Sequence, residues 1–174
     1  MTIMILLTIA NAEAFEFRTG VVSSTGKDDE YVYDGKTYNS GDSVNILIEI
    51  DDYWKINHGK FGWGWRLGGS YPLNTDAWYY GTTLIDAGFA VGYDIIKDLT
   101  IKGEVGAGLD YINEDNRVFA MYLGLGLDYI LADHYILGVS VRQYGEHMAD
   151  HWKDDSTYDY TNVKTTLYVG YRFW

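Results

Sequence analysis

His147 and His151, four residues apart, are the side chains of this sequence best placed to do chemistry. They lie in the segment GEHMADHWKDDSTYDY, which also supplies several acids and Ser156. A histidine with a serine or acidic partner can act as a general base. Two histidines at this spacing on a helix can bind zinc. The segment has no helical period and no clear third ligand, so a solvated polar loop is the simpler interpretation.

The acidic segment 27–42, KDDEYVYDGKTYNSGD, also lacks a tight metal site. An EF-hand loop needs Glu at its twelfth position, and this segment does not match that pattern. The sequence therefore predicts no catalytic residue, no bound metal and no cofactor. A lipid A-modifying enzyme that uses His147 or His151 is kept as an alternative.

The elements that would position these residues repeat with period two. In FGWGWRLGGSY, aromatic and aliphatic residues alternate with Gly, Arg and Ser, which is the pattern of a strand with one apolar face. The pattern predicts eight strands, over residues 15–23, 43–56, 60–72, 78–93, 99–112, 117–131, 135–145 and 160–174.

Composition narrows the class of protein. The 174 residues fit one domain, and the absence of Cys rules out a disulfide framework. The formal charge of -12 argues against a nucleic-acid partner, which would need a basic surface. The high aromatic content argues against disorder.

The N-terminal sequence MTIMILLTIANAEA is apolar and ends in Ala12-Glu13-Ala14, a small-x-small cleavage pattern. It predicts a signal peptide over 1–14 and a barrel domain over 15–174. Cleavage after Ala10-Asn11-Ala12 and a buried N-terminal strand or helix are the alternatives. No later stretch of about 18 apolar residues predicts a transmembrane helix.

The predicted connections alternate in length. Short ones fall at 57–60, around 95–99 and at 131–134, and longer ones at 24–42, 73–77, 113–116 and 146–159. Antiparallel strands would place all short turns at one end and all long loops at the other, as in an outer-membrane barrel.

The polar faces of the strands decide which side faces water. They contain most of the strand glycines and a nearly balanced set of charges. A narrow lumen explains both features, because Gly makes room for long side chains and acids pair with bases. These charged residues are Glu16, Arg18, Glu49, Asp51, Arg66, Asp86, Lys102, Glu104, Asp110, Asp128, Arg142, Lys164 and Arg172.

Aromatic residues cluster near both ends of the predicted strands and suggest two girdles at the membrane interfaces. The turn-side girdle is predicted to hold Phe15, Phe17, Trp54, Phe61, Trp63, Tyr93, Tyr129, Tyr135 and Phe173. The loop-side girdle is predicted to hold Tyr71, Trp78, Tyr79, Tyr111, Phe119 and Tyr160. The pattern thus favours an all-β, eight-stranded, antiparallel up-and-down transmembrane barrel. The alternative is a soluble secreted barrel that binds an apolar ligand inside.

The sequence resembles the small eight-stranded outer-membrane proteins, such as the OmpX/Ail group and the OmpA transmembrane domain. The resemblance covers about residues 15–174, and its specific element is the ending VGYRF at 169–173. It implies a Gram-negative outer-membrane location and recognition of the C-terminal strand by the barrel-assembly machinery. Trp174, one residue beyond the usual terminal Phe, departs from the pattern.

We expect a cell-envelope protein with a structural or surface-binding role through its extracellular loops. Interior bulk from Arg66, Tyr122 and Tyr168 predicts a plugged lumen, which excludes a large-solute pore. The expected partners are outer-membrane lipids, lipopolysaccharide and the assembly machinery, and the barrel is expected to be a monomer.

Overall fold

The computed structural model describes residues 14–26, 30–33, 36–39, 43–55, 60–73, 83–111, 117–148 and 158–173. It describes side chains over 15–24, 44–52, 60–73, 85–109, 119–145 and 163–173. No helix in this part of the chain is long and apolar enough to cross a bilayer.

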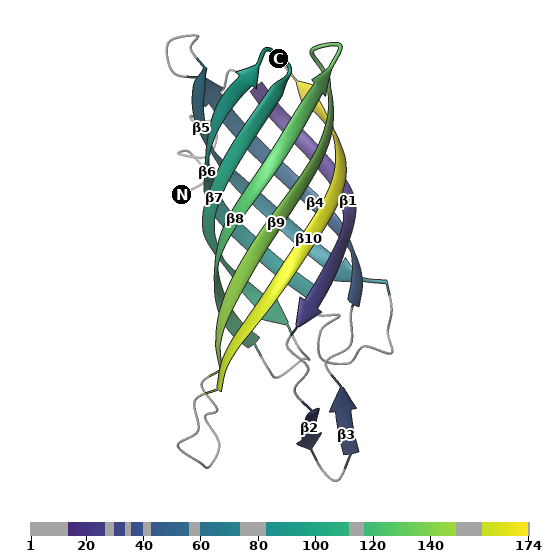
Figure 1. Cartoon of the computed structure of the whole chain (residues 1–174). Coiled ribbons are helices and arrows are strands. Elements are labelled where there is room, and N and C mark those ends of the chain that lie inside the picture. Colours follow the sequence, from purple (N-terminus) through teal and green to yellow (C-terminus); the bar gives the residue numbers. More distant parts are fainter. Residues whose placement is uncertain are drawn as a thin grey trace, which may run out of the picture.

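Eight antiparallel strands close into a barrel in the order β1-β10-β9-β8-β7-β6-β5-β4 (Figure 1). Closure is made by β1 and β10, which pair from Phe15 opposite Phe173 to Gly26 opposite Asn162. The barrel strands are β1 (Ala14–Gly26), β4 (Ser43–Lys55), β5 (Phe61–Pro72), β6 (Thr83–Ile96), β7 (Leu99–Tyr111), β8 (Arg117–Leu131), β9 (Tyr135–Met148) and β10 (Tyr158–Phe173).

The two ends of the barrel differ in the length of their connections. Residues 56–60, 97–98 and 132–134 join strands at one end, which we call the turn end. Residues 27–42, 74–82, 112–116 and 149–157 join strands at the other, which we call the loop end. In Figure 1 the turn end is at the top, with the C-terminal end of β10. The predicted alternation is confirmed for 27–42, 74–82 and 149–157, but 112–116 is no longer than 56–60 at the turn end.

The predicted strand boundaries need small corrections. β1 and β9 each extend three residues further than expected, to Gly26 and Met148, and β10 begins at Tyr158. β6 continues to Ile96, with a register shift between Asp94 and Ile96. The predicted start of that strand, at 78, lies outside the described residues.

The segment 24–42, predicted to be a loop, contains two further strands. β2 (Glu30–Tyr33) and β3 (Lys36–Asn39) form an antiparallel two-stranded sheet separate from the barrel. Four residues are too few to show an alternation of period two, so the sequence pattern does not predict these strands.

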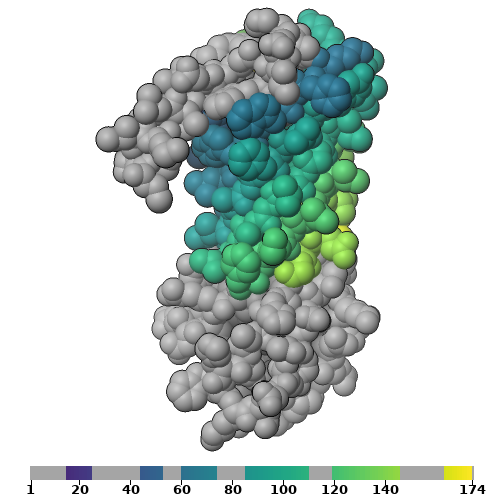
Figure 2. Space-filling view, turned by 90° about the vertical axis from the view of Figure 1, so that its left-hand side faces the viewer, coloured from purple at the N-terminus to yellow at the C-terminus, as the bar shows by residue number. Residues whose placement is uncertain are grey.

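Apolar side chains face outward and charged side chains face inward. Leu123, Leu125 and Leu167 expose 69%, 66% and 66% of their surface, whereas Arg66 and Lys102 are each 1% exposed. A water-soluble barrel needs the opposite arrangement, because apolar surface in water is unfavourable and buried charge is costly. The barrel is therefore of the transmembrane type, and the soluble-barrel alternative is wrong. Figure 2 shows one face of this wall as a continuous packed surface.

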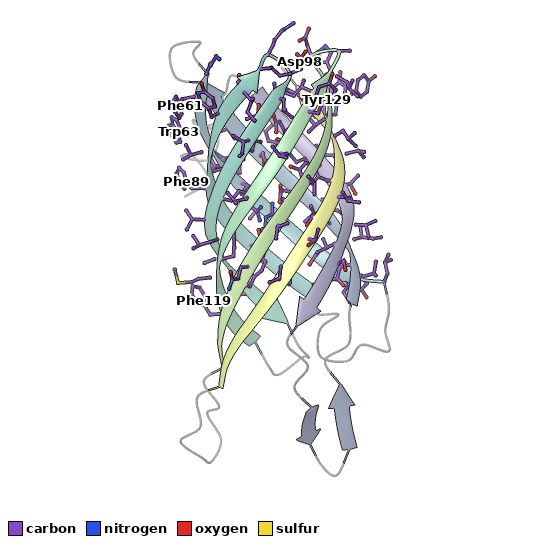
Figure 3. All side chains as sticks on the ribbon, viewed as in Figure 1. Phe61, Trp63, Phe89, Asp98, Phe119 and Tyr129 are labelled. Carbon is purple, nitrogen blue, oxygen red and sulfur yellow. The ribbon has the colours of Figure 1, made fainter. Side chains whose placement is uncertain are left out.

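The described aromatics support the predicted girdles. Phe61, Trp63 and Tyr129 lie on the outer surface near the turn end, and Phe119 lies near the opposite end (Figure 3). Tyr71 is exposed at the loop end as well. The side chains of Trp54, Trp78, Tyr79, Tyr111 and Tyr160 lie outside the described part.

Candidate functional site

The lumen is the most distinctive chemical environment of the described chain. Every barrel strand contributes at least one charged residue to it, because alternate positions on each strand point inward. All the charged residues predicted to line the lumen are buried, except Asp110, whose side chain is not described. Asp52 is buried too, although strand alternation places it on the outer face.

A turn-side cluster gathers three acids and three bases, namely Glu16, Arg18, Asp51, Lys102, Asp128 and Arg172. Arg18 is its centre. Its Nη2 pairs with Glu16, and it lies 2.9 Å from both Asp51 Oδ2 and Asp128 Oδ2. Lys102 Nζ lies 2.7 Å from Asp128 Oδ2. The cluster is charge-balanced, so each buried ion has a partner of opposite sign.

A central cluster lies next to it along the lumen and consists of Glu49, Arg66, Asp86, Glu104 and Arg142. Arg66 contacts Asp86 Oδ1 at 2.5 Å and Glu104 Oε2 at 2.8 Å. Arg142 contacts Glu104 Oε2 at 2.7 Å and Glu49 Oε2 at 2.8 Å.

The two clusters are joined electrostatically. Arg18 Nη1 lies 3.5 Å from Glu49 Oε1, so the turn-side and central clusters form one continuous ionic network across the lumen. Loss of one member of such a network is destabilising, because it leaves buried charge short of a partner.

Tyrosine rings fill the space between the ions. The Arg66 guanidinium lies 4.8 Å from the Tyr122 ring centre, and Arg18 lies 5.0 Å from that of Tyr168. Glycines make this possible. A Cβ built at Gly106 would overlap the Tyr122 ring, and one at Gly138 would overlap the Tyr168 ring. The expectation that strand glycines make room for bulky lumen residues is confirmed.

A cavity in the described lumen has a volume of about 10 Å³ and is lined by Val22, Leu47, Ser70, Asp86, Arg142, Tyr144, Lys164 and Thr166. That volume is at the lower limit of what a single water molecule needs. Ions and tyrosines occupy the turn-side and central levels of the lumen, which agrees with the predicted plug.

The described histidine outside the loop end has a structural role. His134 is in the β8–β9 turn, and its ring stacks on Tyr171 with centroids 5.5 Å apart. Its Nδ1 lies 3.3 Å from the Arg172 carbonyl oxygen, so it ties the turn to the last strand.

The candidate catalytic residues are only partly placed. His147 belongs to β9 at the loop end, where its backbone is in register with Phe119 and Asp159. Its side chain is not described, and His151 and Ser156 lie outside the described residues. Within the part that the structure describes, no group of three His, Cys, Asp or Glu residues could hold a metal ion. The enzyme alternative thus remains a prediction.

Comparison with solved structures shows the same fold. The crystal structure of Ail, the attachment invasion locus protein of Yersinia pestis, aligns with a TM-score of 0.55 at 14% identity, over 92% of this chain and 98% of Ail. Neisserial surface protein A aligns with a TM-score of 0.53 at 11% identity, over 92% of this chain and 99% of that one. No protein-family model and no curated protein sequence matches the chain.

The resemblance expected from the sequence is therefore confirmed at the level of fold. Eight closed antiparallel strands, an apolar exterior and an ionic interior are the features of a small bacterial outer-membrane barrel. The chain therefore has the fold of these barrels.

Proposed function

We propose that this protein is a sealed membrane anchor that presents its loop-end connections for binding at the cell surface. The observation that carries the proposal is the combination of a filled lumen with long connections at a single end. A filled lumen disfavours transport, and a rigid scaffold with loops at one end is suited to binding.

The barrel itself supports an anchoring role. Its outer surface is apolar between the aromatic residues near the two ends, so acyl chains of membrane lipids are its natural contacts. We further propose that lipopolysaccharide surrounds the loop end, that the assembly machinery recognises the last strand, and that the barrel is monomeric.

The ligand chemistry of Ail does not carry over to this chain. Ail has been solved in complex with the heparin analogue sucrose octasulfate, in a structure that aligns here with a TM-score of 0.54 at 14% identity. The four loop-end connections of this chain contain eleven acids and three lysines, a formal charge of -8 out of -12. Repulsion disfavours a polysulfated ligand at this end of the barrel.

The test compares the full chain with a variant in which 27–42 and 149–157 are replaced by short turns. Both are reconstituted in lipid vesicles, and heat-modifiable gel mobility checks that the barrel has folded. Vesicle binding is measured on immobilised matrix proteins, glycans and cells, together with conductance across a planar bilayer. We expect loop-dependent binding and no sustained conductance. Binding that survives the replacement, or stable open channels, would contradict the proposal.

The enzyme alternative has its own test. Cells expressing the chain and cells expressing its His147→Ala/His151→Ala variant are compared by mass spectrometry of lipid A. An identical profile for the two strains and for an empty-vector strain eliminates the enzyme. A lipid A species found with the parent chain and absent with the histidine variant would support the enzyme and contradict the scaffold proposal.

A further inference from the structure

The outer wall of the barrel changes from aromatic to aliphatic between β6 and β7. A row of cross-strand partners runs around the wall through Trp65, Phe89, Val105 and Leu123. All four face outward near the middle of their strands, but only the first two are aromatic. Aromatic rings are favoured at the two membrane interfaces, so the girdles do not explain rings at mid-strand.

Five outward-facing aromatic residues form what we call the β5–β6 aromatic patch, namely Phe61, Trp63, Trp65, Phe89 and Tyr93. The ring centres of Phe61 and Tyr93 are 4.9 Å apart, and those of Trp63 and Phe89 are 5.8 Å apart with an interplanar angle of 9°. Figure 3 shows Phe61, Trp63 and Phe89 one after another on the outer surface, from the turn end toward the middle of the barrel. The patch therefore runs along the barrel axis, the direction in which the acyl chains of a bilayer extend.

A lysine lies at the turn-side edge of the patch. Lys60 directly precedes β5, and its carbonyl oxygen accepts a hydrogen bond from Asp94 N at 2.8 Å. Its side chain is exposed, and its Nζ lies 5.7 Å from the centre of the Tyr93 ring. Cation–π attraction to that ring holds the ammonium beside the patch. Since the turns of such a barrel face the periplasm, this ammonium lies at the level of the lipid headgroups of the periplasmic leaflet.

Charge indicates which lipid fits. Among the described side chains, Lys60 and Lys97 are the lysine or arginine residues outside the lumen. Lys97 Nζ lies 3.7 Å from Asp133 Oδ1, whereas no described carboxylate pairs with Lys60. Asp52, the acid in the outward phase of the neighbouring β4, is buried. A cation at the headgroup level with an apolar aromatic surface next to it is complementary to a lipid with an anionic headgroup.

We propose that Lys60 and the β5–β6 aromatic patch bind an anionic phospholipid of the periplasmic leaflet. The lipid phosphate pairs with the Lys60 ammonium, and an acyl chain lies along the rings of Phe61, Trp63 and Phe89. Rigid rings supply a large contact area at low entropic cost. The inference rests on the anchoring part of the proposed function, to which it adds one specific lipid at the turn end.

The experiment reconstitutes the full chain in phosphatidylcholine vesicles that contain a minor fraction of phosphatidylglycerol. Bromine is placed on the acyl chains of the phosphatidylglycerol or of an equal fraction of the phosphatidylcholine. Bromine quenches nearby tryptophans, so Trp63 and Trp65 report which lipid occupies the patch. The other four tryptophans, Trp54, Trp78, Trp152 and Trp174, are replaced by Phe in every sample.

We expect phosphatidylglycerol to be enriched at the patch about fivefold over phosphatidylcholine, because one lysine near a membrane surface attracts an anionic lipid by about that factor. The enrichment should fall as salt rises. Equal quenching by the two brominated lipids would overturn the proposal.

Variants of the two exposed lysines locate the headgroup. Lys60→Gln should remove the preference for phosphatidylglycerol. Lys97→Gln is the matched control, because Lys97 is exposed at the same end and is paired with Asp133, and it should keep the preference. Heat-modifiable mobility checks that each variant has folded. An equal loss in the two variants, or a parent-like preference in Lys60→Gln, would overturn the proposal.

Variants of the rings locate the acyl chain. Phe61→Leu/Phe89→Leu keeps the wall apolar but removes two rings of the patch, and Phe119→Leu removes an exposed ring near the opposite end as the control. Native mass spectrometry after detergent extraction measures the phosphatidylglycerol that stays bound. We expect severalfold less retention in the double variant and parent-like retention in the control. Parent-like retention in the double variant would overturn the proposal.

Failure of this inference and failure of the proposed function are distinguishable. If the two brominated lipids quench equally but loop replacement still abolishes vesicle binding to a panel surface, the lipid site is wrong and the surface role stands. If the lipid preference depends on Lys60 but vesicle binding does not depend on the loops, the surface role is wrong and the lipid site stands.

Discussion

Arg18 and Asp128 are 110 residues apart in sequence, yet Arg18 Nη2 donates to Asp128 Oδ2 at 2.9 Å across the lumen. Arg18 lies on β1 and Asp128 on β8, two strands that are not neighbours in the sheet. The contact therefore exists only because the barrel is closed and narrow. It shows that the interior is one ionic network rather than a set of local pairs.

Replacement of Arg18 should be among the most damaging changes in the lumen. Arg18→Met leaves Glu16, Asp51 and Asp128 short of a cation in a buried environment. We expect the free energy of unfolding to fall by about 3–5 kcal/mol. Urea unfolding in lipid vesicles, followed by tryptophan fluorescence, measures it.

Lys97→Met is the control, because the Lys97 side chain is 81% exposed and its contact with Asp133 is 3.7 Å. Exposed ion pairs contribute little to stability, so the urea-unfolding midpoint of Lys97→Met should match that of the parent. The double variant Arg18→Met/Asp128→Leu should recover part of the loss, since it restores equal numbers of acids and bases in the turn-side cluster. Equal midpoints for the Arg18 and Lys97 variants would mean that the network does not stabilise the barrel.

Gly103 and Gly106 lie on the same strand, β7, but on opposite faces of the barrel wall. Gly106 shares the inward face of Glu104, and Gly103 is on the outward face. A Cβ at Gly106 would overlap the Tyr122 ring, whereas at Gly103 the nearest atom, Val91 O, is 4.0 Å away. Gly106→Val should cost about 1–3 kcal/mol, because the lumen is already packed. Gly103→Val faces lipid and should leave stability unchanged or slightly higher. Urea unfolding in lipid vesicles measures both variants. Similar losses in the free energy of unfolding would show that backbone effects outweigh lumen packing.

The β8–β9 turn contains a removable source of strain. Ala132 and Asp133 have φ values of 50° and 62°, and His134 N donates to Leu131 O at 3.1 Å. Both central residues are in the left-handed region, as in a type I′ turn, which Ala tolerates poorly and Asn tolerates well. Ala132→Asn should therefore stabilise the barrel by about 0.5–1 kcal/mol. A lower unfolding midpoint than that of the parent would contradict this account of the turn.

Strand alternation predicted which face of each strand points inward, because a side-chain period of two depends only on local sequence. It placed Arg66, Lys102 and Arg142 correctly in the lumen. It did not predict that Arg142 bonds to both Glu49 and Glu104. Such partners depend on the register of all eight strands and on barrel closure, which the sequence pattern does not encode directly.

The misses follow from the same limit. The sequence does not predict that Asp52 is buried. Asp52 is opposite Phe15 and Trp65 in the sheet, and strand alternation puts all three on the outward face. The β2–β3 hairpin is too short to show a period. Function was the least predictable part, because loop-end residues follow no periodic rule and a fold does not fix a function.

Phe173 and Trp174, the last two residues of the sequence, are expected to differ in their importance for assembly. Phe173 is on the outer face, 47% exposed, with its ring 4.8 Å from that of Tyr171 and 6.2 Å from that of Phe15. Trp174 is one step out of phase with it and lies outside the described residues. Phe173→Ala should lower the fraction of assembled barrel in cells several-fold, whereas deletion of Trp174 should leave assembly nearly intact. Heat-modifiable mobility of outer-membrane fractions measures both.

Tyr135→Ala is the control, since Tyr135 is 58% exposed at the same end but belongs to β9. If Phe173 acts through recognition by the assembly machinery, Phe173→Ala should still refold into pure lipid vesicles like the parent. Equal defects for Phe173→Ala and the Trp174 deletion would refute the division between these two residues.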